Sequence, residues 1–267
     1  MKRLEAVIFD WAGTTVDHGS LAPVRAVTEL FQRHGVPLTD AEARKDMGIF
    51  KRDHIRNILA MPRVSQQWCE LTGALPDEQD VSKLFADFLP LQMLILEDYS
   101  QLIQGVPELV ERLRSRGLRI GSTTGYTRPM LDVLLHCAKH AGYRPDAALC
   151  PDDVPGGRPH PWMCLQLAIE FRLSAVWTAV KIGDTVSDIG EALNAGMWAI
   201  GVAATGNEIG LSASDVAAVP QEDRCARIEA ARERLLAAGA HYVVDSATGC
   251  EPVLDEIDTR LAAGDRP

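Results

Sequence analysis

The first apolar run of the chain, with the residues that follow it, reads Ala6-Val7-Ile8-Phe9-Asp10-Trp11-Ala12-Gly13-Thr14-Thr15. Four consecutive apolar residues, two of them β-branched, predict a short strand buried on both faces, as in a parallel sheet. Asp10 and Gly13 end the run, so the strand is expected to lead into a loop. Because ligands of such sheets bind beyond the carboxyl ends of the strands, Asp10 is a candidate for chemistry.

Outward from this stretch, the chain contains two kinds of sequence. Residues 21–99 carry helical patterns interrupted by glycines and prolines, and no strand signal between about 40 and 99. From Gly105 onward, predicted helices alternate with strands over 118–122, just before 151, and over 179–182, 198–202 and 241–244. This alternation predicts an α/β fold with a doubly wound parallel sheet. We expect an α/β core formed by residues 1–20 and 100–267, with residues 21–99 as an inserted helical domain.

The helices of the α/β part are expected between and after these strands, where apolar residues recur at helical spacing. Their predicted ranges are 106–116, 128–141, 161–171, 187–195, 222–238 and 251–261. In the insert, a helix over 21–34 has Pro23 in its first turn and Gly35 at its end, and another is expected over about 78–96.

The composition and net charge of the chain argue against some classes of binding partner. The chain has 267 residues, of which 46% are hydrophobic and 24% charged, as is usual for a globular protein. Its net charge of −10 and pI near 5.2 argue against nucleic acid or a membrane surface as partner. An anionic small molecule remains possible as a substrate, since a metal ion and a few cations can reverse the potential inside one cleft.

The cysteines and the apolar segments predict a location. Six cysteines are scattered without any CxxC spacing, which argues against a disulfide framework or a zinc site and fits a reducing compartment: Cys69, Cys137, Cys150, Cys164, Cys225 and Cys250. The chain begins directly with a strand-like run, and no apolar stretch reaches the roughly 18 residues that a membrane span needs. We therefore expect a cytoplasmic protein.

Four places near predicted strand ends carry residues capable of chemistry: Asp10, Thr124, Arg158 and the pair Asp184/Asp188. Each alone has an ordinary structural explanation, such as a helix cap, a turn hydroxyl or a surface charge. The predicted strand alternation, however, brings all of them to one edge of one sheet. In this order and context, a separate structural explanation for each of them becomes improbable, and together they form a candidate active site.

The joint pattern resembles the four signature motifs of the haloacid dehalogenase superfamily. It consists of Asp10-Trp11-Ala12-Gly13-Thr14-Thr15, Ser122-Thr123-Thr124-Gly125, Gly157-Arg158-Pro159 and Gly183-Asp184-Thr185-Val186-Ser187-Asp188. The helical insert is similar to the cap domain of that superfamily. Its phosphatases generally carry a second aspartate two residues after the nucleophile as general acid and base, and here Ala12 stands in that place.

Ala12 leaves two interpretations, an inactive phosphatase or an enzyme whose leaving group needs no such acid. The second is favoured by Met47-Gly48, Lys51 and Asp53-His54 in the insert, which together with the first motif resemble the phosphonoacetaldehyde hydrolase family. Further similar stretches run almost end to end: Gly121-Ser122-Thr123-Thr124-Gly125-Tyr126, Pro151-Asp152-Asp153, Gly157 to Met163, Asn194 to Trp198 and Gly239 to Tyr242.

The resemblance implies cleavage of the carbon–phosphorus bond of phosphonoacetaldehyde, with Asp10 attacking phosphorus and Lys51 forming a Schiff base. It further implies substrate contacts from Thr124, Arg158, His54 and Met47, and Mg²⁺ bound by Asp10, the Ala12 carbonyl and Asp184, with Asp188 supporting the site. Lys51 must be neutral to react, and either burial under the cap or the neighbouring charge of Arg52 can lower its pKa. A homodimer is also implied.

Three alternatives remain at this point. The first is a superfamily phosphatase or phosphomutase acting on a small phosphate ester, which Ala12 disfavours. The second is a catalytically inactive, ligand-binding relative, which the intact acidic motifs disfavour. The third is a dehalogenase, which needs no magnesium and so leaves Asp184 and Asp188 unexplained.

Overall fold

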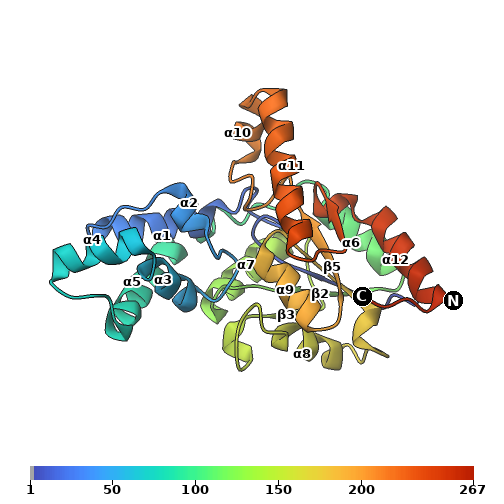
Figure 1. Cartoon of the computed structure of the whole chain (residues 1–267). Coiled ribbons are helices and arrows are strands. Elements are labelled where there is room, and N and C mark those ends of the chain that lie inside the picture. The colour runs from blue at the N-terminus through green and yellow to red at the C-terminus, as the bar shows by residue number, and fades with distance from the viewer. Residues whose placement is uncertain (1–2) are drawn as a thin grey trace.

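The computed structural model describes residues 3–267 and contains a six-stranded parallel sheet with helices on both faces (Figure 1). The strands follow the order β3-β2-β1-β4-β5-β6 across the sheet, and every neighbouring pair is parallel. Their bounds are β1 Ala6–Phe9, β2 Arg119–Thr123, β3 Ala147–Leu149, β4 Ala179–Gly183, β5 Trp198–Val202 and β6 Tyr242–Val244. The predicted doubly wound α/β fold is confirmed.

Five helices come from the first hundred residues: α1 Leu21–Arg33, α2 Asp40–Arg44, α3 Lys51–Leu59, α4 Pro62–Thr72 and α5 Glu78–Leu96. Seven more follow: α6 Val106–Ser115, α7 Arg128–His140, α8 Trp162–Glu170, α9 Val186–Asn194, α10 Ala213–Ala218, α11 Gln221–Ala237 and α12 Glu251–Ala263. The predicted helices and strands agree to within about two residues. Helix α10 was not predicted, because its six residues bury no side chain and so leave no apolar pattern.

Alternation along β1 explains the two helical layers. Val7 and Phe9 belong to the apolar cluster that includes residues of α6, α7 and α12, whereas Ala6 and Ile8 pack with residues of α8. Successive side chains of a strand point to opposite faces, so this central strand is covered on both sides. Its four residues are almost completely buried, as the continuous apolar run predicted.

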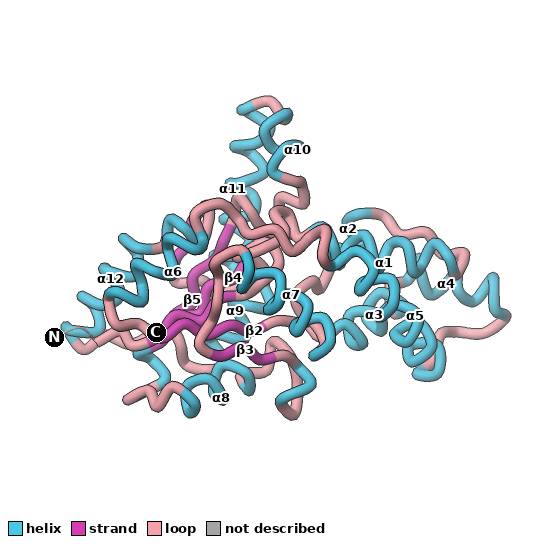
Figure 2. Tube along the Cα trace, turned by 180° about the vertical axis from the view of Figure 1, so that it is seen from behind, coloured by secondary structure: helices cyan, strands magenta, loops and turns pink. Residues whose placement is uncertain are grey.

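Helices α1–α5 form a group beside the sheet, while α10 and the first part of α11 project away from it (Figures 1 and 2). Within the group, α5 packs against α1 and α3, and α2 packs against α1. The division into a core of residues 1–20 and 100–267 and a helical domain of residues 21–99 stays a prediction. Within residues 3–267, no helix is both long and apolar enough to cross a membrane.

Candidate active site

Three loops at the carboxyl ends of neighbouring strands bring the predicted residues together. Asp10 follows β1, Thr124 follows β2 and Asp184 follows β4, and β1 pairs directly with both other strands. These three residues and Ala12 line one cavity, together with residues of the helical group. The full lining is Asp10, Ala12, Ser20, Pro23, Met47, Gly48, Lys51, Thr124, Gly125, Tyr126, Arg158, Asp184 and Thr185.

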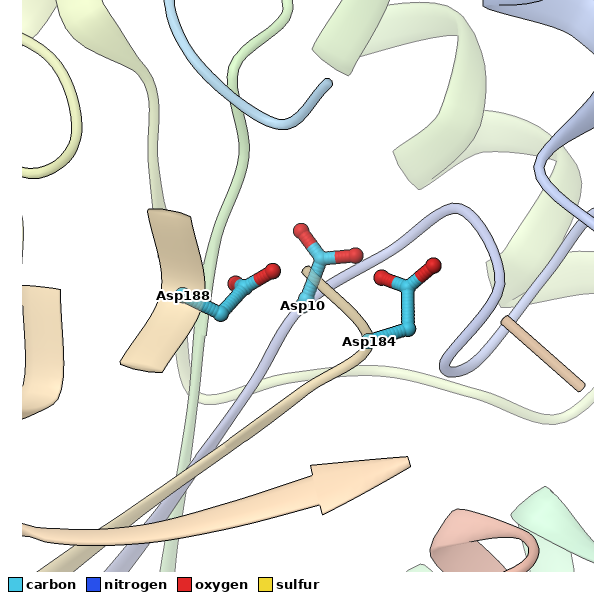
Figure 3. A group of neighbouring side chains, drawn as sticks. All are labelled: Asp10, Asp184 and Asp188. Atoms are coloured by element: carbon cyan, nitrogen blue, oxygen red, sulfur yellow. The ribbon is translucent and has the colours of Figure 1, made fainter. Parts of the chain in front are cut away.

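Three carboxylates converge on this edge of the sheet. Oxygen atoms of Asp10, Asp184 and Asp188 lie within 4.8 Å of one another, and Asp10 stands between the other two (Figure 3). Burial raises the pKa of Asp10, and the charge of Asp188 adds to this rise. Burial and the charges of Asp10 and Asp188 raise the pKa of Asp184 well above its ordinary value. Both therefore need positive charge nearby to stay ionised.

Two buried cations supply part of that charge. The Arg158 Nη1 atom lies 2.7 Å from Asp10 Oδ1 and 2.9 Å from Asp188 Oδ1, and the Lys181 Nζ atom donates to Asp188 Oδ1 at 2.7 Å. Burial alone would raise the pKa of Asp188, but these two cations outweigh it and hold that pKa below its usual value. Glu191 accepts a hydrogen bond from Arg158 Nε at 2.9 Å, so the guanidinium is held from a second side.

The charges of this cluster leave room for a divalent cation. Four buried carboxylates, Asp10, Asp184, Asp188 and Glu191, face two buried cations, Arg158 and Lys181, so negative charge is in excess even when Lys51 across the cavity is protonated. Carboxylate oxygens at a hydrophilic strand edge are the ligands that Mg²⁺ prefers. The donor set of Asp10, Asp184 and Asp188 therefore fits Mg²⁺.

Lys51 faces the same cavity from the other side, at the first residue of α3. Its side chain is buried, its amine donates to Met47 Sδ at 3.3 Å, and the same nitrogen lies 5.7 Å from the centre of the Tyr126 ring. Burial lowers the pKa of Lys51 to about 8, a shift that the attraction of Asp10 only partly offsets. Arg52 instead pairs with Glu78 on the surface, so burial is the main cause of the shift, and the charge of Arg158 adds a smaller lowering.

The segment before Lys51 fits tightly onto the core. Gly48 has a φ of +92°, and a Cβ atom there would lie 2.4 Å from Thr185 Oγ1. The Ser187 hydroxyl donates to the Met47 carbonyl at 3.1 Å. Only glycine fits this close approach, which sets the distance between the Lys51 amine and the core loops.

His54 and Asp188 lie outside the cavity lining. The Nε2 atom of His54 is 2.8 Å from the Lys45 carbonyl, and the buried ring has a pKa lowered to about 3 by burial and then by the charge of Lys51. Asp188 is directed to Lys181, Arg158 and the Thr185 hydroxyl. The other predicted residues, Asp10, Ala12, Met47, Lys51, Thr124, Arg158 and Asp184, all line the cavity.

Three buried residues of the site were missed as functional residues. Tyr126 lines the cavity beside Lys51, and its hydroxyl has no hydrogen-bond partner among the described residues. Lys181 and Glu191 hold Asp188 and Arg158. A lysine in the otherwise apolar run of β4, and a glutamate one helical turn after Asp188, are sequence signals that could have indicated this buried ion cluster.

Comparisons with known proteins agree with this geometry. Residues 4–196 match the family of haloacid dehalogenase-like hydrolases. A phosphonoacetaldehyde hydrolase of Syntrophobacter fumaroxidans is 45% identical over 99% of this chain and 95% of its own length, and one of Bacillus cereus is 44% identical over 96% and 97%.

Solved structures give the same result. The crystal structure of a phosphonoacetaldehyde hydrolase-like protein from Oleispira antarctica superposes with a TM-score of 0.97 at 42% identity, covering 99% of this chain and 96% of the other. A β-phosphoglucomutase from Clostridium difficile, with a TM-score of 0.69 at 16% identity over 97% and 99%, shares the fold alone. The chain is a hydrolase that belongs to the haloacid dehalogenase-like hydrolases and, within them, to the phosphonoacetaldehyde hydrolase family.

Proposed function

We propose that this enzyme hydrolyses the carbon–phosphorus bond of phosphonoacetaldehyde, giving acetaldehyde and phosphate. The observation that carries the proposal is the pairing of a buried lysine, whose pKa is lowered to about 8, with Asp10 across one cavity. A buried amine with a lowered pKa is suited to condense with a carbonyl, and a strand-end carboxylate is suited to attack phosphorus. The names of the full-length relatives support the same substrate.

The reaction begins at Lys51. Its neutral amine adds to the aldehyde carbon, water leaves, and a protonated imine forms between Lys51 and the substrate. Burial keeps part of the lysine in the reactive neutral form at physiological pH. Met47 Sδ, 3.3 Å from the amine, helps to orient the nitrogen without offering it a charge.

Cleavage then occurs between carbon and phosphorus. An Asp10 carboxylate oxygen attacks phosphorus, the carbon–phosphorus bond breaks, and its electron pair moves into the imine to give an enamine. The enamine is protonated on carbon, and water releases acetaldehyde and the Lys51 amine. A second water hydrolyses the aspartyl-phosphate. No alkoxide leaves in this sequence, which explains why Ala12 suffices where phosphatases carry an aspartate.

The phosphoryl oxygens need positive charge and hydrogen bonds. Arg158, whose Nη1 atom lies 2.7 Å from the Asp10 carboxylate, and Thr124, which lines the same cavity, are proposed to hold these oxygens. Asp10, the Ala12 carbonyl and Asp184 would hold Mg²⁺, which would supply positive charge to neutralise the phosphoryl group. Asp188 supports this site through Arg158 and Lys181. His54, buried one turn after Lys51, is proposed to aid substrate binding by holding the Lys45 carbonyl and with it the segment that leads into α3.

The two sides of the cavity must separate for turnover. The cavity enclosed between them measures only about 20 Å³, roughly the room of one water molecule. We propose that residues 21–99 act as a cap that opens to admit substrate and closes to exclude water. Aldehyde chemistry in a closed, dry site protects the imine until phosphorus has been transferred.

The proposal includes a homodimer that forms through the cap. A groove of about 790 Å³ lies between α1 and α5, and Leu94, which lines it, is 78% exposed. Unpartnered apolar side chains on a helix favour contact with a second copy. Sedimentation of the wild type and of Leu94→Glu tests this point; a wild-type monomer contradicts it.

The activity is tested by supplying phosphonoacetaldehyde with MgCl₂ and measuring acetaldehyde and phosphate together. Equal amounts of the two products are expected, with little phosphate from simple phosphate esters under the same conditions. Rapid release of phosphate from esters, without acetaldehyde from the phosphonate, would show that the enzyme is a phosphatase instead.

A further inference from the structure

Arg44 joins the helical group to the core. It is the last residue of α2, its side chain is 12% exposed, and its Nε atom donates to Asp40 Oδ2 at 2.9 Å. Its other nitrogens cross to the core: Nη1 donates to the carbonyls of Gly19 at 3.1 Å and Asn207 at 3.3 Å, and Nη2 donates to the Gly210 carbonyl at 3.1 Å. Nη1 is also 3.2 Å from the side-chain oxygen of Asn207.

The loop that Arg44 contacts also holds a proposed metal ligand. In the segment 205–210, which follows β5, the backbone N–H of Asn207 donates to Asp184 Oδ2 at 2.7 Å. The Thr205 hydroxyl in the same segment donates to the Gly13 carbonyl, in the loop that carries Asp10 and Ala12. The Arg44 side chain, which belongs to the helical group, therefore contacts the segment that orients Asp184.

The local sequence is suited to this contact. An arginine presents several N–H donors in a fixed plane, so one side chain can satisfy separate carbonyls, and Asp40 holds the plane in place. At Gly210 a Cβ atom would lie 2.7 Å from the Arg44 guanidinium carbon, so this position leaves room for the cation. Hydrogen bonds from a charged donor are among the stronger ones, and opening of the cap would expose them to water.

We propose that Arg44 is a positioning residue that couples closure of the cap to binding of a divalent cation at Asp184. The proposal rests on the proposed function in one respect, that residues 21–99 open and close. Closure seats the guanidinium on segment 205–210 and steadies the Asn207 N–H that orients Asp184. Because coupling between two sites is reciprocal, cation binding must favour closure by the same factor.

The test uses the full chain without substrate and compares Arg44→Met with Arg33→Met. Arg33 is a matched control, since it also belongs to the cap and pairs with a carboxylate four residues earlier, Glu29, but that pair is exposed on the surface. The affinity for Mg²⁺ is measured by titration calorimetry. Hydrogen–deuterium exchange of segments 45–50 and 205–210 is measured with and without MgCl₂.

In the wild type and in Arg33→Met, Mg²⁺ should slow exchange in both segments. In Arg44→Met we expect Mg²⁺ affinity to fall about 5-fold or more and segment 45–50 to gain no protection from Mg²⁺. Wild-type affinity, or Mg²⁺-dependent protection of 45–50 that persists in Arg44→Met, overturns the proposal.

Arg44→Lys keeps the positive charge but loses the planar set of guanidinium N–H donors. If Arg44→Met does not fold, the proposal is tested on Arg44→Lys by the same criteria. It should bind Mg²⁺ less tightly than the wild type and lose most of the protection of segment 45–50. These readouts need no turnover, so they separate failure of the coupling from failure of the proposed reaction, which the products from phosphonoacetaldehyde report.

Discussion

The two sides of the cavity differ in whether their buried ionisable groups form ion pairs. On the core side, Asp10 and Asp188 each have a cation within 3 Å, at distances of 2.7 to 2.9 Å. On the cap side, Lys51 is equally buried but forms no ion pair with any described residue, and it has a thioether as its neighbour. Burial raises the pKa of Asp10 and lowers that of Lys51.

This difference teaches how one cavity holds two kinds of reactive group. Carboxylates that must remain charged are placed among cations, because burial otherwise favours their neutral form. An amine that must lose its proton is buried without a partner, so the same effect activates it. Each variant or condition below changes one side of the cavity, and the measurement shows whether the other side still functions.

The largest effect is expected for Lys51→Arg. Arginine keeps a positive charge but cannot form an imine, so turnover of phosphonoacetaldehyde should fall by about 10⁴-fold or more. Steady-state kinetics measure this, with Lys83→Arg on the exposed face of α5 as the matched control. Substantial activity in Lys51→Arg would rule out the imine.

Removal of the metal should disable the transfer of the phosphoryl group on the core side. Chelation by EDTA, or Asp184→Asn, should lower phosphate release by about 100-fold or more. The Lys51 amine should still condense with the aldehyde, because Asp184 does not contact it. Undiminished phosphate release in EDTA would contradict the proposed role of the carboxylate cluster.

Gly48→Ala should shift the cap side of the cavity relative to the core side. Its Cβ atom would clash with Thr185 Oγ1 and move Lys51 away from Asp10, so kcat should fall about 10- to 100-fold. Gly73→Ala is the control, since Gly73 has a similar φ of +82° but nothing within 4 Å of the added atom. That variant should lose about 1–2 kcal/mol of stability and keep its kcat. Equal kinetic effects in both variants would mean that strain, not position, is responsible.

The pH profile should report the Lys51 pKa. The protonated amine cannot attack, and its pKa is lowered to about 8, so kcat/KM should rise about tenfold per pH unit up to pH 8 and then level off. A profile that levels off near pH 10 would show that the amine is not activated by burial.

The smallest effect concerns stability and His54. Its pKa is about 3 in the folded chain and 6.5 when unfolded, so below pH 6.5 the unfolded state binds the proton first. Stability should therefore fall with decreasing pH, by about 2 kcal/mol between pH 7 and 5. Urea unfolding at both pH values measures this, and His54→Gln should lessen the slope. An unchanged slope in that variant would place the effect elsewhere.

Much of the site could be predicted from the sequence because each strand is encoded locally by its own residues. Short apolar runs ending in Asp10, Thr124 and Asp184 predict parallel strands, and parallel strands bring their carboxyl ends to one edge. Ala12 and Lys51 carried chemistry that the family resemblance made interpretable.

The rest depended on tertiary packing. Whether burial or Arg52 lowers the Lys51 pKa could be decided only when Arg52 was found paired with Glu78. Two of the Arg44 contacts reach residues 163 and 166 positions further along the chain, Asn207 and Gly210, and no local pattern encodes them. The six residues of α10 bury nothing, so no apolar period marked that helix.

The most direct test of the account is borohydride reduction of the enzyme in the presence of phosphonoacetaldehyde, followed by mass mapping of the peptides. The account predicts one reduced adduct, on Lys51, formed with or without EDTA and absent from Lys51→Arg. No adduct on Lys51, while acetaldehyde and phosphate are still released, would contradict the claim that a buried, unpaired amine activates the carbon–phosphorus bond.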